Sequence, residues 1–209
     1  MQTSNQKPAI ILIHEIYGIN GHMKSIINHF ERAGFDVYCP HLLGEVKSFN
    51  YVSEDEAYQH FMNEVGFERA LEDVLRMANH LKKRCTNIFV LGFSVGATVA
   101  WLCSHYGHLF TGIIGFYGSR IRDYLDITPK CKTLLFFPTI ETSFDPQDVL
   151  GVLEKKNKLQ VIMIEGKHGF TNQYSTAFDA VSKSHCFHQT YDFIMTHSKL
   201  KNDRTVGRK

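Results

Sequence analysis

The residues with the clearest chemical potential are Gly92-x-Ser94-x-Gly96, which stand between an apolar run and a helical pattern. A sharp strand-to-helix turn leaves such a serine in a strained backbone position with its Oγ exposed, and side chains at the two glycines would collide with the turn. Val95 would be the first residue of the following helix, and its backbone N–H would therefore be free to bind an oxyanion. The spacing therefore predicts Ser94 as a nucleophile, and the alternative is a plain glycine turn with a capping serine.

A nucleophilic serine needs a base, and His168 is the best candidate by position. It lies in Glu165-Gly166-Lys167-His168-Gly169-Phe170, just past the last apolar run of the chain. Glycine-flanked loops at the carboxyl ends of parallel strands are where catalytic groups gather in open α/β sheets. Other histidines fall inside the last helical pattern, a poorer place for a mobile base: His185, His188 and His197.

The third member of a catalytic triad should come from the loop after the strand expected at 133–137, because the chain order in this architecture is serine, acid, histidine. Glu141, Asp145 and Asp148 all qualify by position. Glu141 is our first choice and Asp145 the alternative acid. Asp145-Pro146 also fits a helix start, with Asp145 as N-cap. The loop sequence does not decide whether the triad acid is Glu141, Asp145 or neither of them.

The second oxyanion donor is expected from the segment after the first strand, which makes the N–H of Ile16 the natural candidate. Glu15, beside it, is a carboxylate at the end of a buried strand, and such a group is costly unless it is paired or hydrogen-bonded. Two interpretations of Glu15 stay open. It either forms a structural salt bridge with an arginine, or supports the site by touching the nucleophile or shaping the cavity.

The remaining sequence alternates between short apolar runs and helical patterns. Strands are expected at 9–13, 35–39, 87–91, 111–116, 133–137 and 160–164, and helices at 23–33, 54–83, 95–105, 147–155 and 173–197. Gly66 is a possible break in the second helix. This alternation predicts an α/β fold, with a doubly wound, mostly parallel sheet covered by helices on both faces. We expect one domain over 1–198 and a polar tail at 199–209.

Composition excludes several classes of protein. The 209 residues carry 23 Lys and Arg against 21 Asp and Glu, a net charge of +2, so neither nucleic acid nor a membrane surface is expected as a partner. Five cysteines with no C-x-x-C pair argue against disulfides and zinc. With no signal-peptide order in residues 1–7 and an apolar run at 9–13 too short for a bilayer, we expect a cytoplasmic protein.

Taken together, these residues resemble the dienelactone hydrolase family of α/β-hydrolases over roughly 9–197. The similarity rests on Ile13-His14-Glu15-Ile16-Tyr17-Gly18, Tyr38-Cys39-Pro40-His41-Leu42, the elbow at Ser94, Phe116-Tyr117-Gly118 and His168-Gly169-Phe170. The resemblance implies an α/β-hydrolase fold and a hydrolase acting on an ester or lactone. It also implies Ser94 as nucleophile, His168 as base, Ile16 and Val95 as oxyanion donors, and Glu15 as the family's buried glutamate.

The chain departs from that family pattern at two places. Its elbow carries Ser94 where the best-known members have cysteine, and a serine depends on its base throughout catalysis. Its acid loop lacks the usual Gly-x-x-Asp, and an ungapped match from Pro146 places Thr142 at the acid position, whereas a one-residue shift gives Glu141. The first departure favours a general carboxylesterase over dienelactone turnover itself.

The sequence thus predicts a serine hydrolase that cleaves a small carboxylic ester or lactone through an acyl-enzyme, with no cofactor or metal, as a monomer or homodimer. The alternatives are an amidase, thioesterase or acyltransferase using the same Ser-His pair, or a non-catalytic binding module with a degenerate triad. We expect 42–61, 117–125 and the helix after His168 to line the pocket. Arg120 or Arg122 is a candidate contact for an acidic substrate group.

Overall fold

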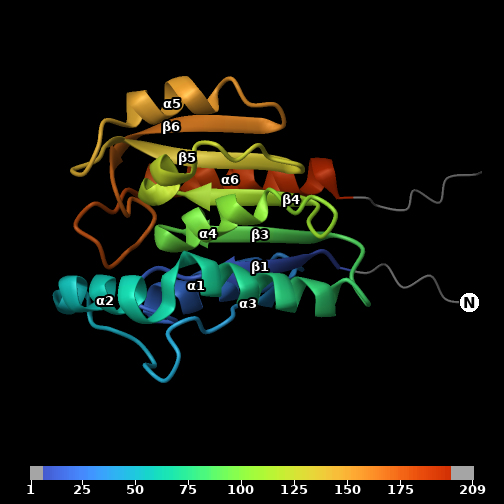
Figure 1. Ribbon diagram of the computed structural model, residues 1–209, viewed down its shortest axis with the longest axis horizontal. Helices are drawn as coiled ribbons and strands as arrows, with labels where there is room; N and C mark the ends of the chain where they lie inside the picture. The colour runs from blue at the N-terminus through green and yellow to red at the C-terminus, as the bar shows by residue number, and fades with distance from the viewer. Residues whose placement is uncertain (1–6, 199–209) are drawn as a thin grey trace, which may run out of the picture.

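A computed structural model of the chain describes residues 7–198; the tail expected at 199–209 lies outside the described residues. Six parallel strands form one sheet in the order β2-β1-β3-β4-β5-β6 (Figure 1). The strands are β1 Ala9–Ile13, β2 Asp36–Tyr38, β3 Ile88–Phe93, β4 Gly112–Phe116, β5 Lys132–Ile140 and β6 Leu159–Lys167. The helices are α1 Gly21–Arg32, α2 Glu54–His60, α3 Gly66–Leu81, α4 Val95–Cys103, α5 Pro146–Leu153 and α6 Ala180–His197.

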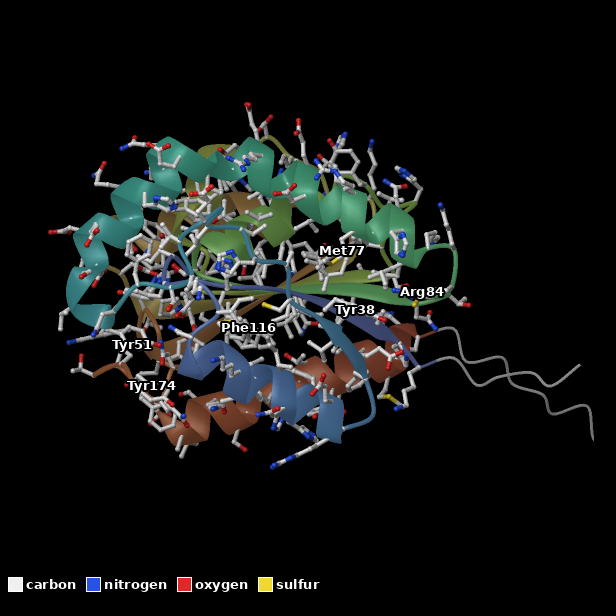
Figure 2. The ribbon with its side chains drawn as sticks, turned by 90° about the horizontal axis from the view of Figure 1, so that it is seen from below. Tyr38, Tyr51, Met77, Arg84, Phe116 and Tyr174 are labelled. Atoms are coloured by element: carbon white, nitrogen blue, oxygen red, sulfur yellow. The ribbon has the colours of Figure 1, made fainter. Side chains whose placement is uncertain are left out.

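Helices cover both faces of the sheet, as the alternation of elements predicts. Alternate residues of β1 point to opposite faces, which is why its run of five apolar residues is wholly buried. Ile10 and Leu12 pack with α1 and α6, whereas Ile11 and Ile13 pack with α3 and α4. Figure 2 shows α1 and α6 below the sheet and α2 and α3 above it. The chain is therefore a single three-layer α/β domain.

The expected break at Gly66 is confirmed, whereas the expected start of the last helix differs from the structure. The pattern at 54–83 is interrupted at Gly66, where φ is +71° and a π-helical turn, Phe61–Val65, joins α2 to α3. The last helix begins at Ala180 and not at 173, because Asp179 caps its first turn by accepting a hydrogen bond from the Ser182 N–H at 2.6 Å. Residues 173–177 form turns and a bend, so the last helix begins seven residues later than expected.

Among the helices of residues 7–198, none is both long enough and apolar enough to cross a bilayer.

Candidate active site

Ser94 occupies a backbone conformation that only a tightly built turn can hold. It lies between β3 and α4 with φ +56° and ψ −120°, a region that costs free energy for a residue with a Cβ. A Cβ on Gly92 would lie 2.1 Å from the carbonyl oxygen of Gly96, and a Cβ on Gly96 would lie 2.5 Å from that of Ile13. Both glycines are therefore sterically required, as the spacing of the motif indicates.

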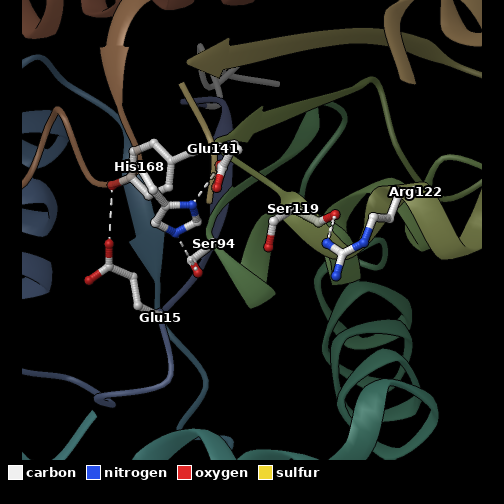
Figure 3. Close-up of polar contacts among 7 residues, drawn as sticks. Glu15, Ser94, Ser119, Arg122, Glu141 and His168 are labelled. Atoms are coloured by element: carbon white, nitrogen blue, oxygen red, sulfur yellow. Dashed lines mark hydrogen bonds and ion pairs between the residues drawn. The ribbon is translucent and has the colours of Figure 1, made fainter. Parts of the chain in front are cut away.

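Three side chains from different loops form a hydrogen-bonded chain at the carboxyl end of the sheet (Figure 3). The Oγ of Ser94 lies 3.0 Å from Nε2 of His168, and Nδ1 of the same ring lies 2.8 Å from Oε1 of Glu141. The Glu141 side chain is 4% exposed and that of His168 is 36% exposed. The carboxylate is thus shielded from water, while the imidazole faces the cavity.

Strand register explains why Glu141 meets His168. β5 and β6 are adjacent and parallel, and an irregularity at Pro138 and Ile140 brings Ile140 opposite Lys167. The next residues of the two strands are Glu141 and His168, so they emerge side by side at the same sheet edge. The apolar pattern predicts that this strand ends at 137, but β5 continues to Ile140. Glu141 therefore follows the strand directly.

The alternative acid has another task. The Asp145 carboxylate accepts a hydrogen bond from the Gln147 N–H at 2.9 Å and caps α5, with Pro146 at the first helical position. Asp148 lies in the first turn of the same helix. Among residues 7–198, neither carboxylate forms a hydrogen bond with His168, so the geometry favours Glu141 over both.

The two expected oxyanion donors lie beside Ser94. Val95 is the first residue of α4, so the helix itself offers no acceptor for its N–H. Ile16 follows β1, which pairs with β3 up to Ile13 and Gly92, and this register carries the segment to the elbow. Ile16, Val95 and Ser94 line one cavity.

His14, to which the sequence pattern assigns no role, holds the Ile16 segment in place. Its Nε2 accepts a hydrogen bond from the Leu42 N–H at 3.0 Å, which leaves Nδ1–H to donate to the Glu15 carbonyl at 2.6 Å. Burial lowers the pKa of His14 to about 4, so the ring is neutral and this tautomer is stable. The motif that contains His14 does not reveal this role, because the role depends on the Leu42 loop from elsewhere in the chain.

Glu15 is buried behind His168 and is bound by neutral groups. Its Oε1 accepts from the Tyr117 hydroxyl at 3.1 Å, and its Oε2 accepts from the Asn172 side-chain N–H at 3.3 Å. Among residues 7–198 Glu15 has no arginine partner, so that expectation is wrong, and it makes no hydrogen bond to Ser94 either. Burial raises the pKa of Glu15 to about 7, although His168, Tyr117 and Asn172 each act to lower it.

Tyr117 contacts both Glu15 and His168. Its ring centroid lies 4.9 Å from that of His168, and its hydroxyl lies 2.8 Å from the Thr171 Oγ1 as well as bonding Glu15. It also has a positive φ of 44°, which is strained for a tyrosine. The available sequence signal was its place after β4 in Phe116-Tyr117-Gly118; the contact with His168 could not be inferred from it.

A cavity of about 480 Å³ opens onto Ser94. The range 42–61 contributes Tyr51, Glu54 and Tyr58, and the range 117–125 contributes Ser119 and Arg120. The third wall is made by residues in the turns at 169–176 and not by a helix, which corrects the sequence-based expectation.

The two candidate arginines differ in position. Arg120 lines the cavity, with its Nε 2.7 Å from the Asp123 carboxylate. Arg122 donates to the Ser119 carbonyl at 2.6 Å (Figure 3). Its guanidinium also lies over the Phe144 ring. Arg122 is therefore engaged in holding the loop, and it is not among the residues that line the cavity.

Across residues 7–198, no three His, Cys, Asp or Glu side chains are grouped so that they could hold a metal ion. The five cysteines are free thiols.

Comparison with known proteins places this geometry in a family. A Bacillus subtilis protein, YczH, is 40% identical over 178 residues, which cover 83% of this chain and 85% of the relative. The carboxymethylenebutenolidase of Pseudomonas putida is 25% identical over 134 residues, covering 60% and 56%. The dienelactone hydrolase-like phosphotriesterase P91, from metagenomic libraries, superimposes with a TM-score of 0.74 at 16% identity, over 93% and 88%. The profile of the dienelactone hydrolase family matches residues 1–198, and the chain belongs to that family.

Proposed function

We propose that the protein is a serine hydrolase that cleaves a small carboxylic ester or lactone through an acyl-enzyme intermediate. The observation that carries this proposal is the hydrogen-bonded chain from Ser94 through His168 to a shielded Glu141. Membership of the dienelactone hydrolase family supports ester chemistry. The Pseudomonas relative, a carboxymethylenebutenolidase, supports including lactones.

In the first half-reaction, the Ser94 Oγ attacks the substrate carbonyl and His168 Nε2 takes its proton. The Glu141 carboxylate, bonded to Nδ1, holds the ring in the required tautomer and stabilises the imidazolium. The N–H groups of Ile16 and Val95 bind the oxyanion of the tetrahedral intermediate. His168 then gives its proton to the leaving alcohol, and the acyl group remains on Ser94.

In the second half-reaction, His168 takes a proton from water, which attacks the acyl carbonyl. The same two N–H groups bind the second oxyanion, and His168 returns the proton to the Ser94 Oγ as the acid is released. A lactone would follow the same steps, except that its leaving alcohol is part of the acyl group, so that deacylation releases a single hydroxy acid.

The proposal is tested by hydrolysis of p-nitrophenyl acetate and butyrate with the wild type and Ser94→Ala, together with labelling by a fluorophosphonate probe. We expect turnover and labelling in the wild type and neither in the variant. A wild type that neither turns over these esters nor labels would overturn the proposal and favour the non-catalytic binding module. Turnover of amides or thioesters at much higher kcat/KM would instead favour an amidase or thioesterase using the same residues.

A further inference from the structure

The wall of the cavity at Ser94 is unusually poor in aliphatic side chains. Of the nineteen described residues that line it, only Ile16 and Val95 are aliphatic, and both sit at the expected oxyanion site. Ten of the others carry a hydroxyl group: Tyr17, Tyr51, Tyr58, Ser94, Ser119, Thr142, Ser143, Tyr174, Ser175 and Thr176. Small-molecule pockets are usually lined mainly by apolar groups, so this wall indicates a polar ligand.

A long acyl chain would fit this wall poorly. It would displace water from hydroxyl groups without replacing their hydrogen bonds, and each such loss costs free energy. The volume of about 480 Å³ is enough for a six-membered ring with a small acyl group, so the restriction on the substrate is chemical and not only one of size.

Tyrosine rings form one continuous side of the cavity. The ring centroids of Tyr17 and Tyr51 are 4.6 Å apart, and those of Tyr51 and Tyr174 are 6.0 Å apart with planes 22° from parallel. Figure 2 shows Tyr51 and Tyr174 together at one end of the molecule. The Tyr51 hydroxyl is held by the side chains of Asn20 and Asn172. Such rings offer an apolar face to C–H groups and a polar edge to hydroxyls.

The charges around the cavity do not favour an anionic ligand. Glu15, Glu54 and Glu141 line it, against a single arginine, Arg120, among the described lining residues. That arginine already faces the Asp123 carboxylate at 2.7 Å. The Glu54 carboxylate and the Arg120 guanidinium can each bond a neutral hydroxyl, because one accepts and the other donates.

From these features we propose that the site takes short-chain esters of polyhydroxylated alcohols, with the alcohol ring against the tyrosines and its hydroxyls bonded by Glu54, Tyr58 and Arg120. This inference rests on the proposed serine hydrolase activity and names its substrate class. The small acyl group lies beside Ile16 and Val95, the only aliphatic part of the described wall.

A matched pair of substrates tests the inference: inositol monoacetate and cyclohexyl acetate, which share a six-membered ring and differ by five hydroxyls. Acetate release is measured for both, and p-nitrophenyl acetate is compared with p-nitrophenyl octanoate. We expect kcat/KM to be about tenfold or more higher for the inositol ester, because polar groups left unpaired by the cyclohexyl ester penalise it. We also expect the octanoate to be a poorer substrate than the acetate.

Equal or higher kcat/KM for cyclohexyl acetate, or a preference for octanoate, would overturn the polyol inference while Ser94-dependent turnover of p-nitrophenyl acetate kept the proposed function intact. Absence of all ester turnover and of fluorophosphonate labelling would overturn both. These outcomes keep the two proposals separate.

Variants locate the preference in the cavity. Glu54→Ala and Tyr58→Phe each remove a bonding group, and we expect each to reduce the inositol-to-cyclohexyl ratio of kcat/KM about threefold or more, mainly through KM. Glu56→Ala is the matched control, since Glu56 is an exposed glutamate of the same helix that does not line the cavity. Equal losses for both esters in the first two variants would show a structural role alone and overturn the assignment.

Discussion

Replacing Glu15 by glutamine should stabilise the protein, and more so as the pH rises. Glu15 is buried and its pKa is raised from 4.5 to about 7, chiefly by burial. The folded state therefore holds this proton more tightly than the unfolded state does. The contribution of Glu15 to stability is fully present below pH 4.5 and is lost as the pH rises through about 7.

The size of the effect follows from the two pKa values. A tenfold change in a protonation equilibrium is worth about 1.4 kcal/mol, so a rise from 4.5 to about 7 destabilises the folded state by about 3 kcal/mol once Glu15 is ionised. Glutamine is neutral at every pH and keeps an oxygen that can accept from Tyr117. Any loss of unfolding free energy from fitting its amide against Asn172 is the same at all pH values. The pH dependence of the difference in stability therefore reports only the ionisation of Glu15.

The assay is urea unfolding of the wild type and Glu15→Gln at about pH 5 and about pH 8.5. We expect the free energy of unfolding of the variant, relative to the wild type, to increase by about 2–3 kcal/mol between these conditions. Glu56→Gln, at an exposed position, should show no such change. A relative stability that stays constant or falls as the pH rises would refute the reasoning.

Other substitutions test the site and the fold. Glu141→Gln should lower kcat about 10²–10⁴-fold with p-nitrophenyl acetate, whereas Asp145→Ala should retain kcat and lose about 1 kcal/mol of unfolding free energy with its helix cap; equal losses of kcat would contradict the assignment of Glu141. Burial lowers the pKa of His22 to about 3 from 6.5, so its contribution to stability is present above pH 6.5 and is lost as the pH falls. His22→Leu should thus remove about 1.4 kcal/mol per pH unit of acid destabilisation in unfolding titrations below pH 6.5, and an unchanged slope would argue against it. Gly92→Ala should abolish activity or soluble expression, because its Cβ would lie 2.1 Å from a backbone carbonyl, whereas Gly151→Ala, with nothing within 4 Å, should be tolerated; a fully active Gly92→Ala would show that the elbow can relax.

The fold class follows from sequence because its signals are local. Continuous apolar runs such as 9–13 indicate strands buried on both faces, and the 3.6-residue periods between them indicate covering helices. The predicted helix boundaries are wrong where the local sequence pattern and the tertiary contacts favour different structures. The pattern from 173 onward looks helical, yet Asp179 caps a helix that begins at Ala180. The preceding residues instead form turns that line the cavity.

The candidate nucleophile and base are also readable from sequence, since each lies in a short motif whose glycines meet a steric or conformational demand. The partners of these residues are not readable in this way. Glu141 adjoins His168 because an irregularity in the pairing of β5 and β6 brings Ile140 opposite Lys167, so that the two strands end at the same position. Glu15 meets Tyr117 and Asn172, residues 102 and 157 positions away along the chain.

The sequence by itself therefore determined the doubly wound α/β fold and the identities of Ser94 and His168 as candidates, because strand, helix and elbow patterns depend on neighbouring residues. Only the tertiary structure decided which acid faces the histidine, what surrounds the buried Glu15, and that the cavity wall is polar. Those properties depend on strand register and on loops brought together from distant parts of the chain, and no local pattern encodes such contacts.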